Sequence, residues 1–226
     1  DGANFAVAFE QLGVSQAGLF VRFVSADGAR GLRVTTVQTL ADERHPAIAF
    51  SGTHYLVLCD SDTNGNLDIV GNLMLPDGTL LATTTGFPII TTPGDQSLPA
   101  VAWDGQNFQV VVQDLRSGTA DIYGARVSTA GALLDGTGVP ISAAANAQTV
   151  PSIACGGGTC LSAWQDFRGG ASNDIFGSRV SAGASADPSG ISISTATNTQ
   201  ASPSVAYDFT NNRYLVVWYD SRGASP

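Results

Sequence analysis

The sequence predicts an all-β protein, a β-propeller built from four-stranded antiparallel blades. Three observations support this: a repeat of about 52 residues, a 43% apolar fraction that suits a large core, and a charged fraction of only 13% without any lysine. Long solvated helices carry charged residues on their exposed face, whereas 26 glycines suit short strands joined by tight turns. A repeat of about 40–50 residues that contains four strands is typical of propeller blades.

The repeat is marked by a Pro-x-(Ile/Val)-Ala segment. It recurs at spacings of 53, 52 and 52 residues, beginning at Pro46, Pro99, Pro151 and Pro203. Proline lacks an N–H and suits the first position of a strand, and the small alanine lets neighbouring blades approach one another at the axis. We therefore expect the first strand of each blade to start at this proline and to line the axis.

Three further strands are expected in each unit. The second is a nearly continuous apolar run, which is typical of a strand covered on both faces. The third follows an Asp-Ile-(Tyr/Phe/Val)-Gly block, and the fourth is short. The second strands are predicted at 55–59, 108–112, 160–164 and 214–218, and the fourth at 87–90, 139–142 and 191–194.

The predicted blades divide a single domain, residues 1–226, into five parts: 1–45, 46–98, 99–150, 151–202 and 203–226. The first lacks its opening strand and the last ends after two strands. Three arrangements fit these ends: an imperfectly closed five-bladed ring, part of a longer propeller, or a ring that takes further blades from another protomer. The chain starts at Asp1 without a signal sequence, so we expect a mature or excised piece.

The net charge of −9 disfavours nucleic acid and anionic membranes as partners, and it suits cations. No apolar run is long enough to insert into a membrane. Cys155 and Cys160 flank a four-residue turn and are predicted to form a disulfide, the alternative being two buried thiols. A disulfide implies an oxidising compartment, so we expect a secreted or cell-surface protein, with Cys59 buried and unpaired.

The segment from Asp60 to Asp68 has oxygen-bearing side chains at the spacing of a calcium loop, around a glycine that permits the turn. The predicted Ca²⁺ ligands are Asp60, Asp62, Asn64, the carbonyl of Asn66, and Asp68. This loop resembles the calcium hairpins of integrin-α-type (FG-GAP) propellers. A polar hairpin built from Asx-turns is the alternative. The other units have Gln-Asp-x-Arg here, so the site would occur once.

A W-x-D-x-R…D-I-Y/F-G pattern repeats from blade to blade. An aspartate and an arginine two residues apart invite a catalytic interpretation, but a group repeated in every blade favours a bidentate pair that pins the hairpin. The residues of this structural motif are Asp114, Arg116, Asp121, Trp164, Asp166, Arg168, Asp174, Trp218, Asp220 and Arg222. The pattern resembles tandem repeats of large secreted bacterial proteins, which implies a propeller but no activity.

No catalytic residue is predicted, because the sequence lacks a nucleophile elbow, a phosphate loop and a dinucleotide motif. His45 and His54, with Asp42 and Glu43 nearby, fit either a transition-metal site or a solvated turn. Glu10 and Glu43 are the only glutamates, which makes a pair of carboxylates for glycoside hydrolysis unattractive.

The main functional expectation is a non-catalytic, lectin-like extracellular binding propeller for a glycan or a protein, stabilised by calcium. Trp103 and Tyr207 are candidate stacking platforms for the ligand, with packing inside the blade as the alternative. The other two hypotheses are a secreted glycosidase or lyase with an axial carboxylate site, and a structural repeat of a surface adhesin. An odd histidine or carboxylate pair on the axis would favour the enzyme.

Overall fold

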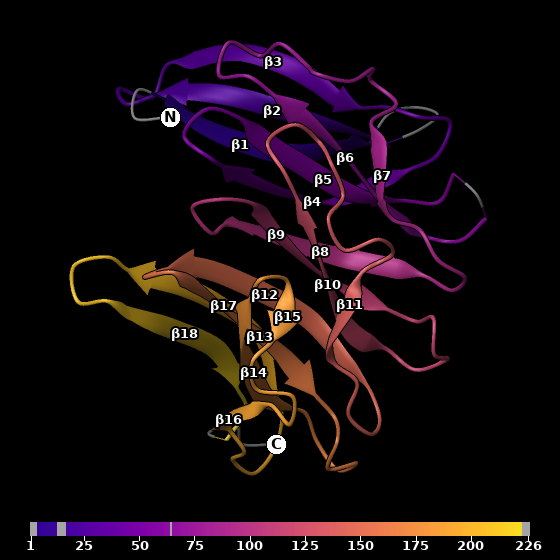
Figure 1. The fold of residues 1–226 in the computed structure, drawn as a ribbon, viewed down its shortest axis with the longest axis vertical. Helices are drawn as coiled ribbons and strands as arrows, with labels where there is room; N and C mark the ends of the chain where they lie inside the picture. The colour runs from indigo at the N-terminus through magenta and orange to yellow at the C-terminus, as the bar shows by residue number, and fades with distance from the viewer. Residues whose placement is uncertain (1–3, 13–16, 64, 223–226) are drawn as a thin grey trace.

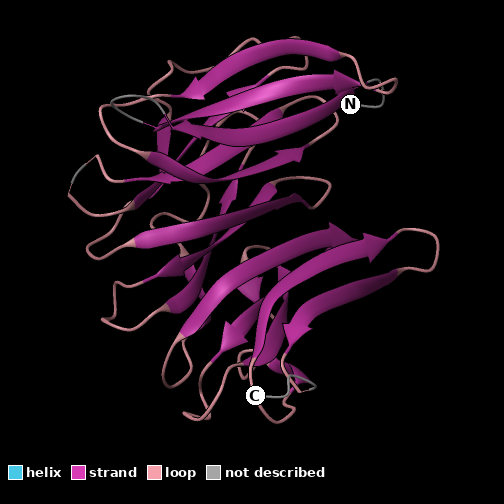
Figure 2. Ribbon diagram, turned by 180° about the vertical axis from the view of Figure 1, so that it is seen from behind, coloured by secondary structure: helices cyan, strands magenta, loops and turns pink. Residues whose placement is uncertain are grey.

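The computed structural model describes residues 4–12, 17–63 and 65–222 and confirms the all-β prediction. Within these ranges the chain forms 18 strands and no helix (Figure 2). The strands make five antiparallel sheets in which neighbours along the chain pair with one another, with one exception in the fourth sheet, whose last strand pairs with the strand two before it. No helix of the described residues is long and apolar enough to cross a membrane.

The sheets follow the chain in order. Sheet one contains β1 (Asn4–Leu12), β2 (Ala17–Ser25) and β3 (Arg30–Val37). Sheet two contains β4 (Glu43–Phe50), β5 (Tyr55–Ser61), β6 (Asp68–Met74) and β7 (Phe87–Ile90). Sheet three contains β8 (Gln96–Trp103), β9 (Phe108–Asp114), β10 (Asp121–Val127) and β11 (Val139–Ser142).

Sheet four contains β12 (Gln148–Gly156), β13 (Thr159–Asp166), β14 (Asp174–Ser181), the short β15 (Ala184–Ser185) and β16 (Ile191–Ser194). Sheet five contains β17 (Gln200–Asp208) and β18 (Arg213–Asp220). The fourth strands β7, β11 and β16 lie at the predicted residues, and the second strands run beyond the predicted apolar runs at their carboxyl ends.

The sheets pack face to face in a curved row, with sheet one at one end and sheet five at the other (Figure 1). Their first strands are neighbours: β4 packs on β8, β8 on β12 and β12 on β17. Each junction buries apolar side chains from both sheets. Between sheets two and three, for example, Leu56 and Leu58 pack with Phe108. Each such side chain contributes about 1.5–3 kcal/mol when buried, which explains why the second strands are apolar on both faces.

The first strand of each later sheet starts three residues before the predicted proline. The reason is an irregularity in its pairing with the second strand, such as the shift between Arg44 and Ala47. The residue before each proline has a left-handed backbone, with φ between 51° and 52°, and these residues are His45, Leu98, Val150 and Ser202. Such a conformation costs a non-glycine residue about 1–3 kcal/mol, so surrounding contacts must hold it.

A side chain from the preceding sheet supplies one of these contacts. The backbone N of His45 donates to Glu10 Oε2 at 3.2 Å, that of Leu98 to Asp60 Oδ2 at 3.1 Å, and that of Ser202 to Gln165 Oε1 at 2.7 Å. Each acceptor lies near the end of β1 or of a second strand. This hydrogen bond, here called the junction clasp, joins consecutive sheets at the start of their first strands.

The disulfide between Cys155 and Cys160 is present, and the two residues are cross-strand partners in the β12–β13 hairpin. Cys59 is free and buried, as expected. The end sheets expose apolar side chains, including Leu215 and Tyr219 on β18 and Phe5 on β1, each more than 60% exposed. Further blades from a longer chain or another protomer would cover these faces, and this stays a prediction.

Candidate active site

The junction between sheets one and two differs chemically from the others. Of the four left-handed residues that precede the prolines, only His45 has an ionisable side chain; the other three are Leu98, Val150 and Ser202. The residues that hold His45 are also ionisable, because the clasp acceptors on either side of it are Glu10 and Asp60. The repeat is therefore broken by a group of titratable side chains at the start of the first strand.

His45 and Asp60 form a direct pair. Nδ1 of His45 lies 2.7 Å from Oδ2 of Asp60, whose side chain is completely buried while that of His45 is half exposed. An ionised Asp60 accepts a hydrogen from Nδ1, which leaves Nε2 of the imidazole to exchange a proton elsewhere. Asp60 is thus placed to fix the orientation and tautomer of His45.

The environment of Asp60 is unusual for a carboxylate. Burial raises its pKa, although the hydrogen bonds from His45 and from the backbone of Leu98 oppose that change. Its Oδ1 atom is buried and has no hydrogen-bond partner among the described residues. A buried carboxylate with one unsatisfied oxygen is costly, and groups of this kind gather at functional sites.

Glu10 adds an exposed carboxylate to the same junction. Its Oε2 accepts the backbone hydrogen of His45, and its charge contributes to raising the pKa of Asp60. Next to His45, Arg44 pairs with Asp42 at 2.7 Å, both of them partly exposed. An imidazole held by one carboxylate and flanked by a second can both donate and accept protons, which is the requirement for general acid–base chemistry.

The predicted calcium ligands do not converge as they do in a calcium loop. Asp60 faces His45, and Asp62 Oδ1 accepts a hydrogen bond from the backbone N of Asp42 at 3.4 Å. Asn66 donates its amide hydrogens to Asp68 Oδ1 and Gly94 O. Asn64 lies outside the described residues. Within the described part of the chain no group of three or more His, Cys, Asp or Glu side chains is arranged to hold a metal, so Ca²⁺ binding stays a prediction of the pattern.

The repeated Asp and Arg residues form bidentate pairs at the end of the second strands. Arg116 contacts Asp114 at 3.0 and 2.6 Å and lies over the ring of Tyr123 at 3.9 Å. Arg168 contacts Asp166 at 2.8 and 2.7 Å and lies over Phe176. We call this Asp–Arg–aromatic group the hairpin fastener.

The other motif residues lie around the fasteners. Trp164 and Trp218 donate their indole hydrogens to Asp166 and Asp220, and Arg222 pairs with Asp220 at 2.8 Å. Asp121 accepts from Ser117, and burial raises the pKa of both Asp121 and Asp174. These side chains belong to three different sheets and do not converge on one site.

The two candidate stacking residues contact other aromatic rings. Trp103 packs edge-on against Phe108 at 5.0 Å between ring centres, at the margin of the core between sheets two and three. Tyr207 packs against Tyr214 and Phe209, and its ring lies directly over Gly156. A Cβ at residue 156 would lie 2.0 Å from Cδ1 of Tyr207, much closer than van der Waals contact, so this ring position favours glycine there.

The two histidines do not meet. His45 lies near the start of β4, whereas His54 follows its far end, in the turn before β5, where its Nδ1 is 2.9 Å from Thr53 Oγ1. The sequence left a transition-metal site and a solvated turn open for these residues, and it did not predict the contact of His45 with Asp60. A usable signal was present, because aligning the blades shows histidine at a position where the other blades have Leu, Val and Ser.

The fold and this junction define an all-β propeller of about five blades with one asymmetric titratable site. The solved structure of an endo-arabinase from Bacteroides thetaiotaomicron is similar, with a TM-score of 0.61 and 10% identity over 99% of this chain and 87% of that one. A GH43 endo-arabinanase from Bacillus licheniformis gives 0.54 and 14% over 99% and 93%. An α-L-arabinofuranosidase from Lactobacillus brevis gives 0.51 and 12% over 94% and 79%.

No family model matches the chain, and no curated protein matches it. At these identities the similarity to solved structures establishes the fold alone. The main functional expectation from the sequence, a non-catalytic binding propeller, is contradicted. The similar structures that match over most of both chains are glycosidases, in agreement with the carbohydrate-active alternative.

Proposed function

We propose that this protein is a carbohydrate-active enzyme that hydrolyses glycosidic bonds, and that Glu10, His45 and Asp60 form its active site. The observation that carries the proposal is the His45–Asp60 pair at the one described junction where the repeat becomes ionisable. The similarity to arabinan-degrading propellers supports polymers and oligomers of arabinose as the first substrates to test.

Glycoside hydrolysis needs a proton donor for the leaving oxygen and a carboxylate that activates water or attacks the anomeric carbon. We assign the donor to His45, whose protonated imidazole gives its proton to the glycosidic oxygen. We assign the carboxylate to Glu10, the exposed acid of the junction. Asp60 does not reach solvent and acts as a positioning residue that keeps Nδ1 of His45 engaged.

Secretion is part of the proposal. The Cys155–Cys160 disulfide suits an oxidising compartment, and polysaccharide substrates are met outside the cell. The acidic surface, with a net charge of −9, suits a neutral glycan better than a polyanionic one.

The test is an assay of the purified chain on debranched arabinan, arabino-oligosaccharides and aryl α-L-arabinofuranosides, with xylan and galactan for comparison. Released reducing ends are quantified. We expect hydrolysis of at least one substrate and a loss of about 100-fold or more in kcat for His45→Ala and Glu10→Gln. His54→Ala is the matched control and should keep full activity. Full activity in His45→Ala, or no hydrolysis of any glycan by the folded chain, would overturn the proposal.

A further inference from the structure

The hairpin fastener is missing from sheet two. In sheets three and four the arginine side chain fills the space beside the second and third strands. It also donates to a carbonyl that precedes the fourth strand: Arg116 donates to Thr137 O at 2.8 Å, and Arg168 donates to Ser189 O at 2.7 Å. In sheet two, Ser61 stands where the other sheets have the aspartate, Thr63 where they have the arginine, and Val70 where they have the aromatic residue. All three replacements are shorter than the side chains that they replace.

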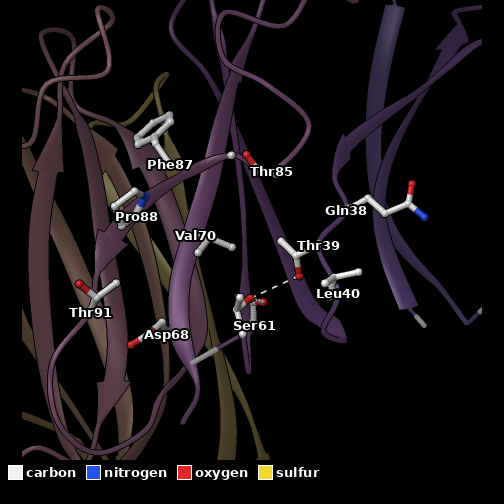
Figure 3. Close-up of a pocket in the computed structure, with 12 residues that line it drawn as sticks. Gln38, Thr39, Leu40, Ser61, Asp68, Val70, Thr85, Phe87, Pro88 and Thr91 are labelled. Atoms are coloured by element: carbon white, nitrogen blue, oxygen red, sulfur yellow. Dashed lines mark hydrogen bonds between the residues drawn. The ribbon is translucent and has the colours of Figure 1, made fainter. Parts of the chain in front are cut away.

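A cavity of about 580 Å³ occupies this space (Figure 3). Volumes of about 300–1,000 Å³ are usual for small-molecule sites. Its wall includes all three replacement residues, together with apolar groups from Leu40, Phe87 and Pro88 and hydroxyl groups from Thr39, Thr85 and Thr91. We call it the sheet-two cavity. The carboxylate of Asp68, which is largely buried, also lines it.

At the corresponding strand pair of sheet two, the acidic residue is on the first strand instead of the second. The second-strand aspartates face glutamines of the first strands, as in the cross-strand pairs of Gln96 with Asp114 and Gln148 with Asp166. In sheet two the pair is Glu43 with Ser61. Sheet two therefore keeps one acidic side chain at this rung of the ladder, but it has lost the arginine that neutralises it in the other sheets.

Glu43 is completely buried and only half satisfied. Its Oε1 accepts from the backbone N of Thr39 at 3.1 Å and from the Thr39 hydroxyl, but Oε2 has no hydrogen-bond partner among the described residues. Glu43 lies behind the cavity wall: Thr39, from which it accepts, and Ser61, its cross-strand partner, both line the cavity. Burial raises the pKa of Glu43, as expected for a carboxyl group that lacks a nearby cation.

We propose that the sheet-two cavity binds a small ligand with a guanidinium or primary ammonium group on a short apolar stem, and that Glu43 and Asp68 supply the counter-charge. The ligand cation would take the place that the arginine guanidinium occupies in sheets three and four. The apolar wall would cover the stem, and the threonine hydroxyls would accept the remaining N–H groups. This site is independent of the proposed hydrolase activity at His45.

The experiment uses isothermal titration calorimetry on the whole chain with n-butylguanidinium as the probe and n-butylurea as its neutral isostere. We expect saturable binding of one n-butylguanidinium per chain and at least tenfold weaker binding of n-butylurea. Glu43→Gln should weaken n-butylguanidinium binding at least tenfold, since it leaves a neutral glutamine as in the other sheets. Asp77→Asn, which removes an exposed charge outside the cavity wall, is the matched control and should bind like the original protein.

A second variant restores the fastener with Ser61→Asp, Thr63→Arg and Val70→Tyr. Its arginine should fill the cavity, so n-butylguanidinium binding should be lost while the melting temperature is kept or raised. Equal binding of n-butylurea, unchanged binding in Glu43→Gln, or retained binding in the folded triple variant would each overturn the proposal. The absence of saturable binding by the original protein would overturn it as well.

Discussion

Nδ1 of His45 lies 2.7 Å from the buried Oδ2 of Asp60, and that same oxygen accepts the backbone hydrogen of Leu98 in the next sheet. One carboxylate thus orients the candidate catalytic imidazole and clasps two blades together. The two roles separate in Asp60→Asn, because the asparagine carbonyl can still accept from Leu98 but carries no charge to hold the protonated imidazole. The predictions below begin with this substitution.

Asp60→Asn is expected to fold with a small change in melting temperature and to lose about 10–100-fold in kcat, with little change in KM, because Asp60 does not reach the substrate. The kcat, the KM and the melting temperature are measured on the same preparations. A loss of activity that merely follows a large fall in melting temperature would assign Asp60 a structural role only.

Glu43→Gln is expected to stabilise the protein at neutral pH. Because burial raises the pKa of Glu43 in the folded state, its contribution to stability is fully present at low pH and is lost as the pH rises through the folded-state pKa. Glutamine removes this loss and can donate to loop carbonyls, as Gln96 and Gln148 do.

We expect a gain of about 1 kcal/mol at pH 7, or a few degrees in melting temperature, that shrinks as the pH falls through the raised folded-state pKa toward the ordinary value for glutamate. Thermal melts of both proteins between pH 3.5 and about 7.5 measure the difference, the range being set by the reference value for glutamate. A difference that does not depend on pH would argue against titration of Glu43 as the cause.

Arg168→Ala should cost about 3 kcal/mol, because it leaves the completely buried carboxylate of Asp166 without its bidentate partner. Arg222→Ala is the comparison. Its pair with Asp220 is exposed to solvent, so removing it should cost much less stability than Arg168→Ala. Urea denaturation of the two variants gives both values, and similar costs would contradict the assignment of Arg168 as a fastener.

The sequence predicts the strands well because each depends on local chemistry. The apolar second strands and the short fourth strands such as Phe87–Ile90 follow from composition and from turn residues at fixed spacing. The left-handed residue before each proline is invisible to such patterns, since it arises from a pairing shift with the second strand. That shift places His45 beside Asp60, 15 residues away in sequence.

The junction with Glu10 depends on packing between sheets, which a single sequence does not encode in any local motif. The alignment of blades nevertheless points to both proposed sites, because residues that depart from the repeat form them. His45 pairs with Asp60, and Ser61 and Thr63 line the sheet-two cavity. Departures from a repeat are thus better guides to these sites than the repeat itself.

Removing the Cys155–Cys160 disulfide should lower stability by about 2 kcal/mol, the loop-closure value for a short loop. The bond closes a hairpin whose turn is already fixed by Gly157 and Gly158, both with positive φ, so the fold should survive its loss. The double variant Cys155→Ala, Cys160→Ala is compared with the original protein by urea denaturation.

Under denaturing, non-reducing conditions the original protein should show one reactive thiol, from Cys59, and three after reduction. Three thiols before reduction would show that the bond does not form in the isolated protein and would remove the disulfide argument for secretion.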